Sequence, residues 1–297
     1  MGGSVPVLRT VAELRAQIAS WRAAGGTVGL VPTMGALHKG HLELVRLAKA
    51  RCRHVVVSIF VNPAQFAPHE DFDRYPRDEA GDLAKLASVG CDLVWSPERT
   101  EMYPEGFATR IVPAGVAEGL ESDFRPHFFG GVATVCCKLF IQVAPDVAVF
   151  GEKDYQQLCV VRQVVRDLNL PLEIAGLPTV READGLAMSS RNAYLSPEQR
   201  QAAPAIYRVI SKIAEAAAQG GIVAAAVAEG YAALAAAGFK ADYLEVRDAE
   251  TLVRPEPGSL RPLRVLAAAW LGKTRLIDNI GVGGGGNVSP LVRPRTG

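Results

Sequence analysis

Residues 27–53 read TVGLVPTMGALHKGHLELVRLAKARCR, and they combine a strand, a polar turn and a helix. Residues 27–32 are mostly apolar, which is typical of a buried strand. Residues 40–53 place Leu42, Val45 and Leu47 among charged side chains, and this pattern predicts an amphipathic helix. The polar segment between them therefore lies where a strand leads into a helix.

The same alternation of strand and helix continues to about residue 175. Residues 55–61 form a continuous apolar run, as in a strand that is buried on both faces. Further strands are predicted at residues 91–95, 146–150 and 172–175, and helices at residues 79–89 and 155–168. This order predicts an α/β fold with a doubly wound parallel sheet, which binds ligands at the carboxyl ends of its strands.

The composition changes after Pro178. Alanine-rich helices are predicted at residues 197–218 and 222–237, and strands at residues 242–246, 263–271 and 275–280. These elements predict a second, smaller α+β domain at the C-terminus. We place the first domain at residues 1–176 and the second at 177–282. Residues 283–297, which begin with four glycines, are predicted to be a disordered tail.

The charge balance limits the classes of partner. The 297 residues contain 32 Lys and Arg against 31 Asp and Glu, a formal charge of +1, so we expect no nucleic-acid partner. Five cysteines include no C-x-x-C pair, which argues against a disulfide framework and a structural zinc site. No signal segment or membrane-spanning apolar run is present, so we expect a cytoplasmic protein that does not bind membranes.

Two histidines flank a glycine in the segment His38-Lys39-Gly40-His41. Their spacing places both imidazoles on one face of the first helical turn, where free backbone amides favour an anion. Gly40 lets a phosphate approach the backbone, and the histidines then stabilise charge on a leaving pyrophosphate. The simpler alternative is a pair of capping or surface histidines.

Three other polar segments are expected at the same edge of the sheet. Asn62 and Gln65 follow the strand at residues 55–61, and a carboxamide suits a hydroxylated substrate because it both donates and accepts. A plain turn at Asn62-Pro63 is the alternative.

Lys153 and Asp154 follow the strand at residues 146–150. Lys153 suits a triphosphate, and Asp154 suits a ribose hydroxyl or a metal-bound water, with Gln157 one turn further on. The alternative makes Asp154 a helix cap. Residues 180–192, VREADGLAMSSRN, supply two hydroxyls and a guanidinium, which form a mobile phosphate clamp or else a surface loop.

The segments PTMGALHKGH, FVNPAQF, GEKDYQQL and READGLAMSSRN occur in this order, and together they resemble the pantothenate synthetase (pantoate–β-alanine ligase) family. The resemblance runs from about residue 5 to Gly281 and includes TRLIDNI near the C-terminus. It implies a Rossmann-like fold of the His-x-Gly-His nucleotidylyltransferase superfamily. It also implies an AMP-forming ligase that converts ATP and pantoate into pantoyl-adenylate, and then condenses the adenylate with β-alanine to give pantothenate.

The resemblance carries over a set of site residues. It implies that the catalytic residues are His38, His41, Lys153, Ser189, Ser190 and Arg191, with His41 as proton donor. The implied ATP contacts are Met34, Gly35, Ala36, Leu37, His38, Lys39, Gly40, His41, Gly151, Glu152, Lys153, Asp154, Val180, Met188, Ser189, Ser190 and Arg191. Thr33, Asn62, Gln65 and Gln157 are expected to bind pantoate. The family also implies Mg²⁺, held mostly by ATP phosphates with protein ligands left open, and a homodimer.

One segment departs from the family pattern. The family reads Arg-Pro-Gly-His-Phe-Asp-Gly where this chain reads RPHFFGG at residues 125–131, so the histidine is displaced by one position. We expect His127 to reach the β-alanine end of the site from the neighbouring position; the alternative is that this role is weakened. Two other functions stay open at this point, another nucleotidylyltransferase of the superfamily and a non-catalytic nucleotide-binding paralogue.

Overall fold

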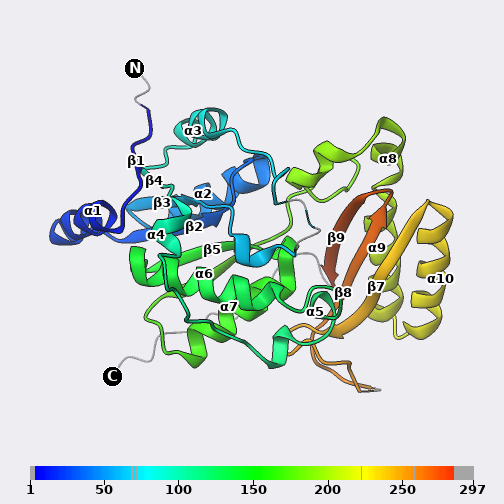
Figure 1. Ribbon diagram of the computed structural model, residues 1–297. Helices are drawn as coiled ribbons and strands as arrows, with labels where there is room; N and C mark the ends of the chain where they lie inside the picture. The colour runs from blue at the N-terminus through cyan, green and yellow to red at the C-terminus, as the bar shows by residue number, and fades with distance from the viewer. Residues whose placement is uncertain (1–3, 68–69, 71, 222, 257, 284–297) are drawn as a thin grey trace.

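The computed structural model describes residues 4–67, 70, 72–221, 223–256 and 258–283, and it contains two sheets (Figure 1). The first is a six-stranded parallel sheet with the strand order β1-β4-β3-β2-β5-β6. Its strands are β1 (Val7–Leu8), β2 (Val28–Thr33), β3 (His54–Ile59), β4 (Leu93–Trp95), β5 (Val147–Gly151) and β6 (Glu173–Leu177). The predicted α/β fold with a doubly wound parallel sheet is confirmed.

The direction of strand addition reverses beside β2. The chain adds β3 and β4 on one side of β2, and it then returns to add β5 and β6 on the other side. The pairing of β2 with β5 sets Gly29 opposite Val147 and Leu30 opposite Ala148. In such sheets a crevice opens at the reversal, outside the carboxyl ends of the strands, and ligands bind there. The segments that follow β2 and β5 therefore meet at one crevice.

Helices cover both faces of this sheet. One buried apolar cluster joins it to α2 (Lys39–Arg51) and α3 (Glu79–Ser88). A second cluster joins the opposite face to α1 (Val11–Ala23), α6 (Phe128–Val143) and α7 (Tyr155–Asp167). The central strands are apolar without interruption because both of their faces are buried.

Helix α6 was not predicted, because twelve of its sixteen residues are buried and it lacks the polar face of an amphipathic helix. Helix α1 and strand β1 were also missed. Short elements connect the longer ones: α4 (Arg99–Met102), α5 (Glu121–Phe124), and the 3-10 helices η1 (Pro63–Gln65), η2 (Gly115–Ala117), η3 (Glu152–Asp154) and η4 (Ser190–Tyr194).

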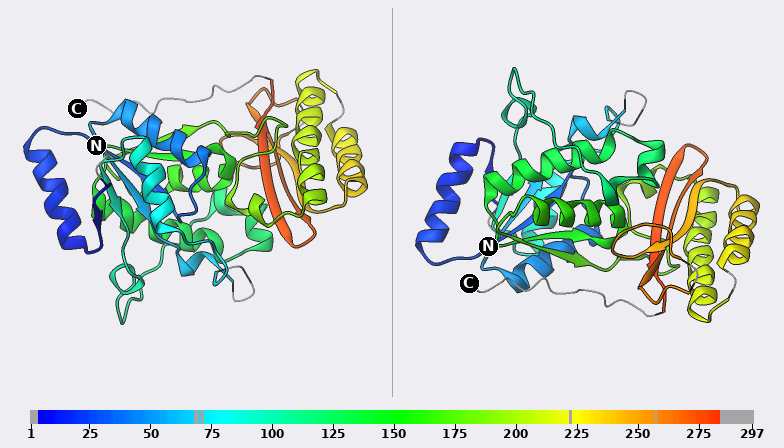
Figure 2. Two further views of the ribbon diagram at one scale, coloured as in Figure 1. Left: turned by 90° about the horizontal axis from the view of Figure 1, so that it is seen from above. Right: turned by 90° about the horizontal axis from the view of Figure 1, so that it is seen from below.

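The second sheet is antiparallel, with the order β7-β8-β9, and helices α9 and α10 pack on it. Figure 2 shows from two sides that this part of the molecule lies at the end opposite α1. Its elements are α8 (Pro197–Ala202), α9 (Ala205–Ala218), α10 (Val223–Ala236), β7 (Phe239–Asp248), β8 (Leu263–Leu271) and β9 (Thr274–Gly281). The single helix predicted at residues 197–218 is wrong: the helix breaks before Ala205, at Pro204, which has no N–H to donate.

We propose a domain boundary close to the expected position between residues 176 and 177, although the parallel sheet extends one residue further, since β6 ends at Leu177 and the antiparallel sheet begins at Phe239. The predicted disordered tail lies outside the described residues from residue 284 onward. Within the described part of the chain, no helix is both long and apolar enough to cross a membrane. All five cysteines are buried free thiols.

Helix α6 packs closely against η1, and a glycine makes this approach possible. A Cβ at Gly131 would overlap the carbonyl oxygen of Ala64, whereas a Cβ at Gly130 would lie 3.6 Å from its nearest atom. We expect Gly131→Ala to lower the free energy of unfolding by about 1–3 kcal/mol, the usual cost of overpacking. Urea unfolding measures this change.

Gly130→Ala is the matched control, because it adds the same methyl group to the same helix without the clash. Alanine favours a helix over glycine, so this variant should be as stable as the parent or more stable, by up to about 1 kcal/mol. Equal stabilities for the two variants would contradict the close packing of α6 on η1.

Candidate active site

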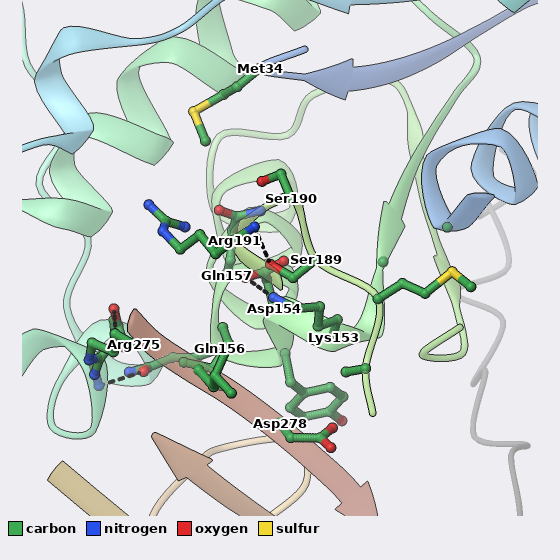
Figure 3. A pocket seen from close by; sticks show the side chains of 18 of the residues that line it. Met34, Lys153, Asp154, Gln156, Gln157, Ser189, Ser190, Arg191, Arg275 and Asp278 are labelled. Atoms are coloured by element: carbon green, nitrogen blue, oxygen red, sulfur yellow. Dashed lines mark hydrogen bonds and ion pairs between the residues drawn. The ribbon is translucent and has the colours of Figure 1, made fainter. Parts of the chain in front are cut away.

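A cavity of about 860 Å³ lies between the carboxyl ends of β2 and β5 and the antiparallel sheet of the second domain. Figure 3 shows that labelled side chains of two segments far apart in the sequence, Lys153 to Gln157 and Ser189 to Arg191, line the same pocket. The predicted site residues that line the cavity are Thr33, Met34, His38, Gly40, His41, Gln65, Gly151, Lys153, Asp154, Gln157, Val180, Met188, Ser189, Ser190 and Arg191.

His38 and His41 cap α2 and face the cavity at the same time. His38 is the N-cap residue, and its Nδ1 accepts a hydrogen bond from the Gly40 N–H at 3.1 Å. The Nδ1 of His41 accepts from the His38 N–H at 3.3 Å, and the two ring centroids are 4.1 Å apart. Since Nδ1 is an acceptor in both rings, a neutral ring carries its proton on Nε2. Each histidine can therefore donate one N–H to a ligand.

Both histidines are neutral at physiological pH. Burial lowers the pKa of His41 to about 3, with smaller contributions from His38 and Lys153. Burial also lowers the pKa of His38 to about 4, and the ammonium of Lys153 is the next largest cause. Lys153 lines the same cavity as both rings, so the segments after β2 and β5 can act on one ligand.

Most of the loop between β2 and α2 lies outside the cavity, and the buried side chain of Asp82 stabilises it. Gly35 and Ala36 both have positive φ angles, 84° and 51°. The Leu37 N–H donates to Oδ1 of Asp82 at 2.8 Å, and Asp82 is 1% exposed. Gly35, Ala36 and Leu37 do not line the cavity, and the side chain of Lys39 is exposed outside it. The contacts to ATP expected of these four residues stay a prediction.

The structure gives a second reason for a glycine at position 40, besides the predicted approach of a phosphate. A Cβ at this position would lie 2.9 Å from Cε1 of His38. The glycine therefore leaves room for the His38 ring to fold back over the start of α2. Its expected role, the approach of a phosphate to the backbone, is compatible with this packing.

The turn after β5 presents Lys153 and Asp154 to the cavity. Asp154 occupies the N-cap position of α7, but its side chain makes no cap hydrogen bond, so the simpler interpretation of Asp154 as a cap is wrong. Its carboxylate lies 3.7 Å from Nζ of Lys153 and is half-exposed. Glu152 does not line the cavity, because its carboxylate pairs with Arg264 at 2.9 Å.

The Ser189-Ser190-Arg191 segment closes another side of the cavity. The Ser190 hydroxyl lies 3.3 Å from the hydroxyl of Tyr75, a buried residue that the sequence analysis missed. Arg181, in the strand-like start of this segment, does not line the cavity and pairs with Asp278 instead.

Asn62 and Gln65 have different roles. Gln65 lines the cavity, whereas Asn62 is 1% exposed and lies behind it. The Asn62 Nδ2 donates to Oε1 of Gln65 at 3.0 Å and to the Gly131 carbonyl at 3.1 Å. The expectation that Asn62 itself projects into the crevice is wrong, because its amide is used to orient Gln65. The Gln65 Nε2 is then the atom left to meet a ligand.

The expectation that His127 reaches the site is also wrong. His127 is exposed at the start of α6 and does not line the cavity. Phe128 lines it instead, with the guanidinium of Arg125 stacked 4.0 Å from its ring centroid. Because the histidine is displaced by one position, a phenylalanine occupies this part of the wall.

One end of the cavity carries a network of charged side chains that the sequence did not predict. Arg275 of β9 donates to both oxygens of Glu121 at 2.8 Å and to Asp242 at 2.7 Å. Arg125 joins the same network through Glu121 at 3.0 Å and Glu70 at 2.6 Å. These alternating charges link the two domains. Arg275 and Arg125 lie in the quoted segments TRLIDNI and RPHFFGG, but their acidic partners are scattered singly along the sequence, so no local pattern indicates the network.

No group of three or more His, Cys, Asp or Glu side chains in the described residues is arranged to hold a metal ion. Asp154 is a carboxylate next to Lys153 at the cavity wall. One such carboxylate fits Mg²⁺, because this ion is often bound by substrate phosphates and water together with only one or two protein carboxylates.

The family model described as pantoate-beta-alanine ligase matches residues 6–281. The chain belongs to the pantoate–β-alanine ligase family. It is 59% identical over 280 residues to a pantothenate synthetase of Caulobacter vibrioides, covering 93% of this chain and 98% of that protein.

Two crystal structures of this family agree with the fold. A pantothenate synthetase from Thermus thermophilus matches with a TM-score of 0.88 at 50% identity, over 93% of this chain and 99% of that one. The ligase from Francisella tularensis, complexed with beta-gamma ATP and beta-alanine, matches with a TM-score of 0.80 at 32% identity, over 94% and 98% of the two chains. The expected family, fold class and ligase activity are thereby confirmed.

The low pKa of His41 predicts a loss of stability in acid. An unfolded chain protonates a histidine near pH 6.5, whereas folded His41 stays neutral down to about pH 3. The free energy of unfolding therefore falls as the pH drops below about 6.5. His41→Gln keeps an acceptor for the His38 N–H and removes the titration.

In urea unfolding, the parent should lose about 2 kcal/mol more than His41→Gln between pH 7 and pH 5. His38 adds to the acid loss in both proteins, so the comparison isolates His41. Parallel losses in the two proteins would show that His41 is protonated in the folded protein at pH 5.

Proposed function

We propose that this cavity joins pantoate to β-alanine in two steps, with the residues named above divided between the two substrates. A carboxylate oxygen of pantoate attacks the α-phosphate of ATP, which forms pantoyl-adenylate and releases pyrophosphate. The β-alanine amine then attacks the acyl carbon, the C–N bond forms, AMP leaves and the amine loses a proton. Support comes from family membership and from the lining of one cavity by all four polar segments.

The nucleotide end of the cavity offsets a repulsion between two anions. A carboxylate 4 Å from a phosphate charge is repelled by about 4 kcal/mol at an effective dielectric constant of 20. Lys153 and Arg191 supply positive charge, and the Nε2–H groups of His38 and His41 supply directed donors. The hydroxyls of Ser189 and Ser190 complete the phosphate contacts. His41 acts here as a hydrogen-bond donor in its neutral form.

Other residues hold the adenosine and shape the site. Met34, Gly151, Asp154, Val180 and Met188 line the cavity and are assigned to ATP. Magnesium, when bound through the phosphates, supplies further positive charge, and Asp154 is the carboxylate we assign to its water shell.

Pantoate is assigned to the other end. Gln65, Gln157 and Thr33 offer amides and a hydroxyl for its hydroxyl groups and carboxylate. Its two methyl groups suit the apolar wall that α6 provides through Val132, Val135 and Leu139. Asn62 acts from behind the wall by holding Gln65.

The cellular setting is inferred from chemistry. We place the enzyme in the cytoplasm, because its five unpaired thiols and its use of ATP suit a reducing compartment. The homodimer rests on the resemblance to the family and stays a prediction.

An omission assay tests the reaction directly. With ATP, pantoate and β-alanine all present, the protein should release AMP and pyrophosphate in equal amounts. Without pantoate neither product should accumulate. Without β-alanine, pyrophosphate release should stop after about one equivalent per site, because the adenylate stays bound. Continuous AMP formation without pantoate would contradict the assignment.

Two substitutions test the phosphate contacts. His41→Ala and Lys153→Ala should each lower the rate of pantoyl-adenylate formation by at least ~10²-fold, the usual effect of losing one electrostatic contact to a transition state. Pantoate-dependent exchange of labelled pyrophosphate into ATP measures this step.

His127→Ala is the control, since this exposed histidine does not line the cavity. It should retain the parent rates of adenylation and of amide formation. Near-parent exchange in both His41→Ala and Lys153→Ala would refute the division of roles, and a slow His127→Ala would refute the position given to that residue.

A further inference from the structure

Asn279, in the TRLIDNI segment of β9, uses its whole side chain on the turn that carries Lys153. Its Nδ2 donates to the carbonyl oxygens of Glu152 at 2.9 Å and Lys153 at 2.8 Å. Its Oδ1 accepts from Nη1 of Arg264 at 3.0 Å. Asn279 is 4% exposed, so water does not compete for these bonds. One amide thus fixes two consecutive peptide groups.

This turn lies outside the regular structure that flanks it. The pairing of β5 with β6 ends at Gly151, and α7 begins only at Tyr155 without a side-chain cap from Asp154. Buried backbone carbonyls that are not paired within a sheet need another hydrogen-bond donor. Asn279 supplies that partner from the second domain.

Arg264 of β8 strengthens the same contact. Its Nη2 pairs with the Glu152 carboxylate at 2.9 Å, and its guanidinium lies 3.6 Å from the ring centroid of Tyr155. The residues on either side of Lys153 and Asp154 are therefore held by the second domain. The Lys153 side chain, mostly buried, still lines the cavity.

We propose that Asn279 is a positioning residue, which holds the turn at residues 152–154 so that Nζ of Lys153 meets the phosphates during adenylation. The proposal rests on the phosphate role assigned to Lys153 above. Asn279 itself also lines the cavity and is assigned no contact with the reacting atoms. Its effect on the rate passes through the lysine.

Asn279→Asp is the informative substitution. The aspartate has the same size and still accepts from Arg264, but it has no amide hydrogens for the two carbonyls. A displacement of a contact by about 1 Å costs up to about 10²-fold in rate. We expect pantoate-dependent pyrophosphate exchange to fall by about 10- to 100-fold, with the loss in kcat and in kcat/KM for ATP, and with the KM for pantoate unchanged.

A double-mutant cycle separates positioning from general damage. Once Lys153 is replaced by alanine, there is no ammonium left to position. The pair Asn279→Asp with Lys153→Ala should therefore be no slower than Lys153→Ala alone. A purely structural role for Asn279 predicts that the two losses multiply instead.

Tyr231→Phe is the matched control in the same domain. It removes the hydroxyl that accepts from the Leu244 N–H at 3.0 Å, a single bond that does not touch the turn. This variant should exchange pyrophosphate at the parent rate. If Asn279→Asp does not fold, as judged by urea unfolding, Asn279→Ser replaces it in the double-mutant cycle with Lys153→Ala. The serine keeps one hydrogen-bond donor and adds no charge beside Asp278.

The outcomes distinguish the two proposals. Parent-like exchange in a folded Asn279 variant, or multiplying losses in the cycle, would overturn the positioning role while leaving the role of Lys153 intact. Parent-like exchange in Lys153→Ala would instead overturn the phosphate role itself. A slow Asn279→Asp with no further loss in the double mutant supports the proposal.

Discussion

The parallel pairing of β2 with β5 holds the active site together, because each strand delivers one of its two main polar segments. Asp146, just before β5, stabilises the beginning of this pairing. Its carboxylate accepts hydrogen bonds from the Val28 N–H at 2.6 Å and from Nη1 of Arg22 at 2.6 Å. A slip of one residue in the register would turn every side chain of a strand to the opposite face of the sheet. The presence of His38 and Lys153 at one cavity is thus a consequence of sheet register.

The chemistry of the site explains why its histidines stay neutral. Burial is the main reason that the charged form of each ring is disfavoured, and the ammonium of Lys153 disfavours it further. A neutral ring also keeps Nδ1 as an acceptor, which both capping bonds of α2 require. The structural and catalytic interpretations of the pair are therefore compatible, since Nδ1 caps the helix and Nε2–H faces the ligand.

The sequence predicted the parts of the fold whose side-chain patterns are local. Strands with continuous apolar runs and segments after strand ends were placed correctly, because parallel strands bring their carboxyl ends to one edge. Helix α6 escaped prediction because its burial leaves no polar face to detect. The division of labour between Asn62 and Gln65 depends on the contact with Gly131 in α6, and no local pattern records that contact.

The contacts that the second domain makes with the site could not be predicted from the sequence for a similar reason, since they join single residues that are far apart along the chain. Neighbouring side chains on β9 reach two different segments of the site, as alternation along a strand allows. Asp278 forms two bonds with Arg181, at the start of the segment that leads to Ser189, while Asn279 holds the turn of Lys153.

The Asp278–Arg181 pair is costly to maintain. Burial raises the pKa of Asp278 even though Arg181 opposes the shift. A buried ion pair contributes little net stability compared with apolar side chains of similar size, although losing one partner costs about 3–5 kcal/mol. The pair is therefore better explained by the position that it gives to Arg181 than by a contribution to stability. Because one strand contacts both segments, β9 fixes the position of one segment relative to the other across the cavity.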